Sequence, residues 1–182
     1  MTTFISILRG INVSGHRMIK MDALRQLYTE MGFSNVQTYI QSGNVVFQYK
    51  KVKLLELEKN IAKKISEKSG FDVPVIVKEY EELKLIIKNN PFLKDKTKDT
   101  SHLHVTFLSA KPDKANFEKI KEGQYQADEF HLVDKSIYLY CPNGYGNSKL
   151  TNSFFESKLK VTATTRNWRT TNELIKIAEK LH

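Results

Sequence analysis

The sequence has a single cysteine, Cys141, and no long apolar run among its 182 residues. One cysteine excludes an internal disulfide and suits a reducing compartment. The longest apolar runs are far shorter than the roughly 20 residues that a membrane-spanning helix needs. The start of the chain, MTTFISILRG, lacks a basic stretch followed by a long apolar run, so we expect no signal peptide. These absences favour a soluble, cytoplasmic protein with no membrane partner.

Most sequence signatures of catalysis are also missing. No paired carboxylates stand out, and there is no Rossmann fingerprint, kinase fingerprint or GxxxxGK[ST] phosphate loop. His102 and His104 would point the same way on a strand, but no third ligand is evident, so we expect no metal site. Ser42 could be a nucleophile, yet the sequence places no base beside it. Catalytic residues and cofactors therefore stay unknown from the sequence.

The composition is that of a folded, basic protein. Apolar residues make up 40% of the chain and aromatic residues 10%, which is enough to build a core. The 29 basic and 20 acidic residues give a net charge of +9, and a basic surface favours phosphates, nucleotides or nucleic acid. However, many lysines lie in expected helices that also carry acids, such as 54–70, and this pattern is typical of a solvated helix face.

Hydrophobic periodicity predicts the same order of elements twice, βαββαβ followed by a further helix. The first half has expected strands at 4–8, 36–40, 44–49 and 73–77, and expected helices at 22–33, 54–70 and 81–90. The second half has expected strands at 102–108, 129–133, 136–141 and 161–165, and expected helices at 113–122, 148–159 and 170–182. The predicted fold class is therefore α+β, a tandem duplication of a ferredoxin-like βαββαβ unit, each followed by an extra helix.

The two halves are expected to be subdomains 1–93 and 102–182, joined by the polar linker 94–101. The number of positions that separates matching residues of the two halves is not constant along the chain. Leu108 lies 100 positions after Leu8, whereas Asp113 lies only 91 positions after Asp22, so the first half carries nine extra residues between its first strand and first helix. These belong to the segment RGINVSGHRMIK. Ordering a loop costs about 1–2 kcal/mol per residue, so a long ordered loop usually has a function.

The topology predicts which polar loops meet. In a ferredoxin-like unit the loop after the first strand shares one end of the sheet with the hairpin between strands two and three. This places 9–20 beside 41–44 in the first half and, at the opposite end of the second half, 142–149 beside 166–170. Five of the eight glycines lie in these segments, where they permit positive φ and close approach of N–H groups to a ligand.

Both long loops also lead into helix N-termini, which favour anions. We expect the two corners to face each other across one cleft that binds a small anionic ligand, phosphorylated or nucleotide-like. The candidate ligand-binding residues in these segments are Arg9, Gly10, Asn12, Gly15, His16, Gln41, Ser42, Asn44, Gly144, Gly146, Lys149, Arg166, Asn167 and Trp168.

Each candidate side chain has a structural alternative. Arg9 and Arg166 suit bidentate binding of phosphate or carboxylate, or a structural ion pair. Asn12 and Asn44 could contact a polar ligand or hold turns. His16 could be a general base near neutral pH or an exposed loop residue without a role.

Two further candidates stand in the second half. Lys149 follows a glycine-rich stretch that resembles a phosphate loop only loosely. Trp168, between two arginines, could stack on a base or simply pack against the protein.

Two other functions are open at this level. A nucleic-acid-binding protein could stack bases on an open sheet face, and the expected strand 136–141 offers Tyr138 and Tyr140 together, although no RNP-type signature is present. A non-catalytic interaction module would use the motif loops only to dock its two halves, with Arg9 and Arg166 buried and paired with acids. The oligomeric state stays unknown.

Four segments in this order resemble the bacterial domain-of-unknown-function family 1697. They are ILRGINVSGHRMIKM, TYIQSGNVVF, GYGNSKLT and TATTRNWRTTNEL. The resemblance covers nearly the whole chain and implies a duplicated ferredoxin-like fold, but it implies no reaction. The sequence departs from the family pattern at Ser14, where a glycine is usual, at His16 and Arg17, where lysine and asparagine are common, and at Asn147, where a basic residue is frequent.

Overall fold

The computed structural model describes residues 1–182, and the chain divides into two compact units. The first unit comprises Met1–Leu85 and Glu173–His182, and the second comprises Ile86–Asn172. Both boundaries fall inside helices, α3 (Tyr80–Lys88) and α6 (Trp168–Glu179). The segment 94–101, expected to be a linker, lies within the second unit in this division. None of the helices has the length and apolarity that crossing a bilayer requires.

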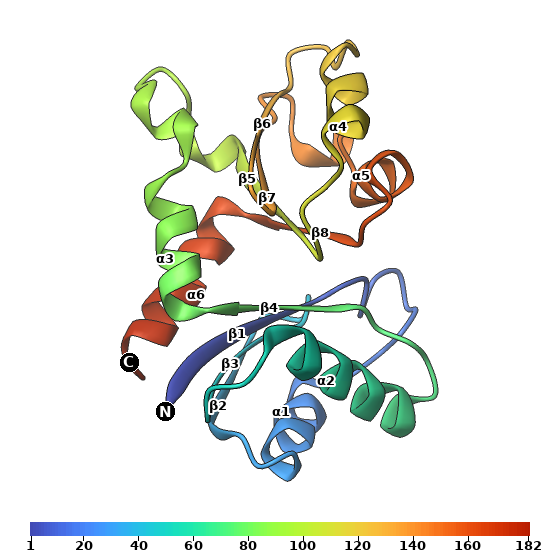
Figure 1. Cartoon of the computed structure of the whole chain (residues 1–182), viewed down its shortest axis with the longest axis vertical. Coiled ribbons are helices and arrows are strands. Elements are labelled where there is room, and N and C mark those ends of the chain that lie inside the picture. Colours follow the sequence, from blue (N-terminus) through green and yellow to red (C-terminus); the bar gives the residue numbers. More distant parts are fainter. The chain divides into compact units, whose positions relative to one another are not determined.

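The first unit is an antiparallel sheet with two helices on one face (Figure 1). Its elements are β1 (Thr2–Leu8), α1 (Met21–Glu30), β2 (Ser34–Tyr39), β3 (Asn44–Tyr49), α2 (Leu54–Ser69) and β4 (Val75–Glu79). The strand order is β2-β3-β1-β4, and every neighbouring pair is antiparallel. Two βαβ crossovers therefore interleave, as in a ferredoxin-like unit.

The second unit has the same topology, with strand order β6-β7-β5-β8 and both helices on one face (Figure 1). Its elements are β5 (Leu103–Leu108), α4 (Lys114–Lys121), β6 (Glu129–Val133), β7 (Ser136–Tyr140), α5 (Asn152–Leu159) and β8 (Ala163–Asn167), with three short 3-10 helices, η1 (Pro91–Lys94), η2 (Thr100–His102) and η3 (Tyr145–Asn147). The predicted fold class is confirmed: two four-stranded antiparallel sheets, consistent with two ferredoxin-like units, with α3 and α6 as the extra helices.

Alternate strand positions build the core of the first unit. Phe4 and Leu8 of β1 pack with Leu24 of α1 in a buried apolar cluster. Ser6 lies between them on β1, and its hydroxyl is 2.7 Å from that of Tyr28. Burial raises the pKa of the Tyr28 phenol, which stays a neutral partner for Ser6. The polar pair is thus satisfied inside the core.

The connection after the first strand is longer in the first unit, as predicted, but the excess is seven residues rather than nine. Residues 9–20 join β1 to α1, whereas only 109–113 join β5 to α4, that is twelve residues against five. The two aspartates used for alignment are not equivalent. Asp113 caps α4 by accepting from the Asn116 N–H, whereas Asp22 lies inside the first turn of α1 and pairs with Arg25.

Gly43 brings the β2–β3 hairpin close to the end of β1 and to Ile11 of this connection. Its carbonyl accepts from the Leu8 N–H at 2.9 Å. Its φ is +80°, and a Cβ placed there would lie 2.6 Å from Ile11 Cδ1 and 2.9 Å from Leu8 Cβ. A side chain of any size would therefore force the hairpin away from the end of β1.

We expect Gly43→Ala to lower the free energy of unfolding by about 3 kcal/mol, because overpacking adds to the cost of positive φ. Gly15→Ala is the matched control, since Gly15 has a similar φ of +77° but nothing within 4 Å of its Cβ position. It should cost only about 1–2 kcal/mol. Urea denaturation of both variants measures the difference, and equal losses would contradict the close approach at Gly43.

Candidate functional site

The long connection 9–20 folds back on itself as a small hairpin. Val13 and His16 form a bridge, with the His16 N–H donating to the Val13 carbonyl at 2.9 Å. The two residues between them, Ser14 and Gly15, have φ of 50° and 77°. Positive φ at both central positions is what a type I′ turn requires, and this turn matches the twist of a two-stranded ribbon. The segment is therefore an ordered element, not an open loop.

The side-chain amide of Asn12 closes the base of this hairpin. Its Oδ1 accepts from the Ile19 N–H at 2.8 Å, and its Nδ2 donates to the Ile19 carbonyl at 2.9 Å and to the Gln41 carbonyl at 2.8 Å. The amide thus pairs with the backbone of Ile19 as a neighbouring peptide group would, and it also attaches the connection to the β2–β3 hairpin. Both amide hydrogens are engaged, so Asn12 positions the backbone around it.

The β2–β3 hairpin is held by Asn44 in a similar way. Asn44 is buried, and its Nδ2 donates to the Tyr39 carbonyl at 3.0 Å and to the Ser42 Oγ at 3.1 Å. Ile40 has a φ of 50°, which the tight turn imposes on it. The topology-based prediction that 9–20 and 41–44 share one end of the sheet is confirmed by the Asn12–Gln41 and Leu8–Gly43 hydrogen bonds.

The exposed groups around this corner are basic. Residues 9–20 contain Arg9, His16, Arg17 and Lys20 but no Asp or Glu. His16, Arg17 and Lys20 are exposed, and Arg9 is half-buried. The next acid along the chain, Asp22, lies 3.0 Å from Arg25 in an ion pair of α1.

Arg17 lies over the backbone of Gly10. Its Nη1 is 3.7 Å from the position that a Cβ of Gly10 would occupy, so the guanidinium lies within van der Waals distance of that residue. Gly10 itself has a φ of 70°. Arg17 was not among the residues predicted for the site, because only the fold of the small hairpin returns it to Gly10, seven positions earlier in the chain.

The corner predicted for the second unit is also present. The His104 ring stacks on the Tyr145 ring with centroids 4.8 Å apart, which places η3 at the start of β5. His104 is in register with Asn167 at the end of β8, so the loop 142–149 and the end of β8 share one end of the sheet. Gly144 has a φ of 86° and Lys149 is exposed, whereas Gly146 has no unusual φ.

The RNW motif has structural roles in this unit. Arg166 is buried, and its Nη1 donates to Thr164 Oγ1 at 3.2 Å and to the Thr165 carbonyl at 2.9 Å. Asn167 Oδ1 accepts from the Thr170 N–H at 2.7 Å, which caps the first turn of α6. Trp168 is the first residue of α6 and is half-buried. The motif therefore marks a strand-to-helix junction.

The structure gathers the predicted site residues in two groups, one in each unit. The group in the first unit is Arg9, Gly10, Asn12, Gly15, His16, Gln41, Ser42 and Asn44. The group in the second unit is Gly144, Gly146, Lys149, Arg166, Asn167 and Trp168. Whether either group binds a ligand stays a prediction.

Other reactive groups of the second unit are withdrawn from solvent. Cys141 is fully buried, and burial, with the nearby charge of Asp128, raises its pKa to about 11. Of the two tyrosines considered for base stacking, Tyr138 is buried and Tyr140 is half-buried, and the Tyr138 hydroxyl donates to the Ile86 carbonyl at 2.7 Å. Burial raises its pKa to about 12. No group of three His, Cys, Asp or Glu residues is placed to hold a metal ion.

The chain belongs to the DUF1697 family, described as proteins of unknown function, whose sequence profile matches residues 1–138. It is similar in structure to the conserved bacterial protein SP0830 from Streptococcus pneumoniae, with a TM-score of 0.74 over 97% of this chain and 98% of that one. The two sequences are 20% identical, so the likeness shows the fold alone. None of the curated proteins searched matches the chain. The resemblance predicted from the four motifs is confirmed, and the family supplies no function.

His104 should make the stability of the protein depend on pH. Burial lowers the pKa of its imidazole below the ordinary value, while the His102 carbonyl, 3.3 Å from Nδ1, opposes the shift. The unfolded chain, with a histidine pKa of about 6.5, therefore binds more protons than the folded one as the pH falls below that value. Stability from this residue is present above about pH 6.5 and is lost on acidification.

We expect His104→Gln to reduce the loss of unfolding free energy between about pH 7.5 and pH 5.5, and His102→Gln, the control, to leave most of that loss in place. Urea denaturation at the two pH values measures it, and NMR titration of the His104 ring checks the pKa directly. A ring that titrates at or above about 6.5 would refute the burial argument.

Proposed function

We propose that the protein binds a small anionic ligand, phosphorylated or nucleotide-like, on the small hairpin of residues 9–20 in the first unit. The observation that carries this proposal is the Arg17 guanidinium, which lies over Gly10 and forms no ion pair. A planar guanidinium can donate two parallel hydrogen bonds to a phosphate or carboxylate group. Arg17 thus has its bidentate donor face available to a ligand.

The local charge supports an anion. Arg17 and Lys20, both exposed, bring two positive charges to a stretch of twelve residues without an acid. Lys20 forms no ion pair either. Unlike lysines on the helices, which face acids on the same surface, these cations have no counter-charge within their own segment. A phosphoryl group, with its double negative charge, would neutralise more of this excess than a single carboxylate.

The fixed backbone supports a ligand of defined shape. Every second residue from Gly10 to Ser14, that is Gly10, Asn12 and Ser14, has a positive φ. Alternation of this kind can turn successive N–H groups toward a common side, where they bind anions. Because Asn12 already orders the segment, binding would not have to supply the ordering free energy of the loop. The second-unit residues Gly144, Gly146 and Lys149 stay a prediction as further ligand contacts.

Isothermal titration calorimetry tests the proposal with a panel of inorganic phosphate, AMP, ATP, GTP and glucose 6-phosphate. We expect at least one phosphorylated compound to bind, and Arg17→Ala to weaken it by at least about tenfold, as for a lost charge-assisted hydrogen bond. Arg25→Ala is the charge-matched control, because Arg25 is exposed on α1 and paired with Asp22. Affinity should also fall with added salt.

Two outcomes would overturn the proposal. One is the absence of binding by every phosphorylated compound in the panel. The other is equal weakening by Arg17→Ala and Arg25→Ala, which would show that net charge, not the Arg17 position, attracts the anion.

A further inference from the structure

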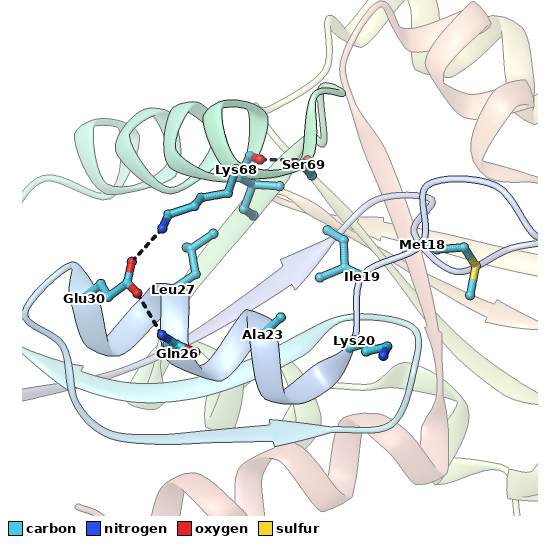
Figure 2. Close-up of a pocket in the computed structure, with 10 residues that line it drawn as sticks. Met18, Ile19, Lys20, Ala23, Gln26, Leu27, Glu30, Lys68 and Ser69 are labelled. Atoms are coloured by element: carbon cyan, nitrogen blue, oxygen red, sulfur yellow. Dashed lines mark hydrogen bonds and ion pairs between the residues drawn. The ribbon is translucent and has the colours of Figure 1, made fainter.

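A cavity of about 320 Å³ opens between α1 and α2 where the connection 9–20 enters α1 (Figure 2). Its lining residues come from the connection, from α1 and from α2, and they are Met18, Ile19, Lys20, Ala23, Gln26, Leu27, Glu30, Ile65, Lys68 and Ser69. The volume is within the range of sites that hold small molecules. The cavity is separate from the Arg17–Gly10 contact, since neither residue lines it.

The middle of the cavity is apolar and its ends are polar. Figure 2 shows Ile19, Ala23 and Leu27 between the two ends, with Lys20 at the start of α1. At the other end Lys68 of α2 reaches Glu30 of α1 at 3.2 Å. An apolar centre with a few polar groups at its margin is the usual composition of a small-molecule site.

The charges at the two ends are not equivalent. The Glu30 carboxylate has two partners: it forms an ion pair with Lys68 at 3.2 Å and accepts a hydrogen bond from Gln26 Nε2 at 3.1 Å. The hydrogen bond and charge of Lys68 lower the pKa of Glu30, so this pair is neutral overall at pH 7. Lys20 forms no ion pair, which leaves one uncompensated positive charge on the cavity wall. The complementary ligand therefore carries one negative charge.

The cavity depends on the longer connection of the first unit. Met18, Ile19 and Lys20 are the last three residues of that connection. Met18 is 62% exposed and lines the cavity from its outer side. The second unit joins the same two elements with five residues and folds in the same topology, so the topology itself does not require a connection of this length, although Ile19 also packs against the core of the first unit.

We propose that this cavity binds a small apolar carboxylic acid, with its hydrocarbon body between Ile19, Ala23 and Leu27 and its carboxylate at Lys20. Burial of the hydrocarbon supplies about 0.8 kcal/mol per CH₂ group as a general rule, and the single charge sets the orientation. This site goes beyond the phosphate-binding function proposed above and shares only Lys20 with it, and its test requires no phosphorylated ligand to bind.

NMR titration of the full chain with octanoate, using methyl-labelled protein, tests the site, and octanol serves as the uncharged probe of equal chain length. We expect saturable shifts of the Ile19, Leu27 and Ile65 methyl groups with octanoate, and at least about tenfold weaker binding of octanol. Ala23→Phe, an exposed position on α1, should fill the cavity and abolish the shifts. Ala115→Phe, exposed on α4, is the matched control and should leave them unchanged.

Lys20→Gln provides a second variant at an exposed position that does not alter the apolar wall, and it should weaken octanoate by at least about tenfold without affecting octanol. Absence of saturable shifts, or shifts that persist in Ala23→Phe, would overturn the site. Equal affinity for octanoate and octanol, or an unchanged affinity in Lys20→Gln, would overturn its selectivity for an acid.

Discussion

The pairing of the Asn12 amide with the Ile19 backbone is the contact on which the first-unit corner depends. It closes the connection 9–20 into a hairpin, and its third hydrogen bond attaches that hairpin to the Gln41 carbonyl. An aspartate at this position would lack both side-chain donors, and an alanine would keep only the backbone N–H that donates to the Arg17 carbonyl. The amide therefore adds polar contacts to a connection that the apolar core holds only through Ile11 and Ile19, since most of its other residues are exposed.

The two units show what the connection adds to a common scaffold. The second unit passes from β5 to α4 with five residues and a capping aspartate, Asp113. The first unit passes from β1 to α1 with twelve, and α1 begins at Met21, where the N-cap residue Lys20 provides no side-chain hydrogen bond. Since both units reach the same topology, the longer connection is a cost in ordering entropy that the fold does not require. Its basic groups and its cavity wall are the two properties that can offset this cost through a ligand.

The fold was predictable because hydrophobic patterning is a local signal. β3 and β6 occupy the predicted ranges 44–49 and 129–133, since both are short runs rich in β-branched and aromatic residues that turns bound. Polar segments were placed less well. β8 begins at Ala163 rather than at 161, and α5 begins at Asn152 rather than at 148, because Thr151 provides the cap.

The candidate site was predictable in its location but not in its chemistry. Topology alone brings 9–20 to 41–44, and the hydrogen bonds confirm it. The pairing of Asn12 with Ile19 and the return of Arg17 to Gly10 depend on two positive-φ residues at a turn, Ser14 and Gly15, together with a side-chain contact seven positions away. Sequence periodicity carries no information on such contacts.

The most direct test of whether the Asn12–Ile19 pairing orders the connection is amide hydrogen exchange at Ile19 in the ligand-free protein. A pre-ordered hairpin predicts exchange slower than in an unstructured chain by at least roughly tenfold, with Asn12→Ala removing that protection while the β1 amides keep theirs. Exchange of the Ile19 N–H at the unstructured rate in the unaltered protein would contradict the account.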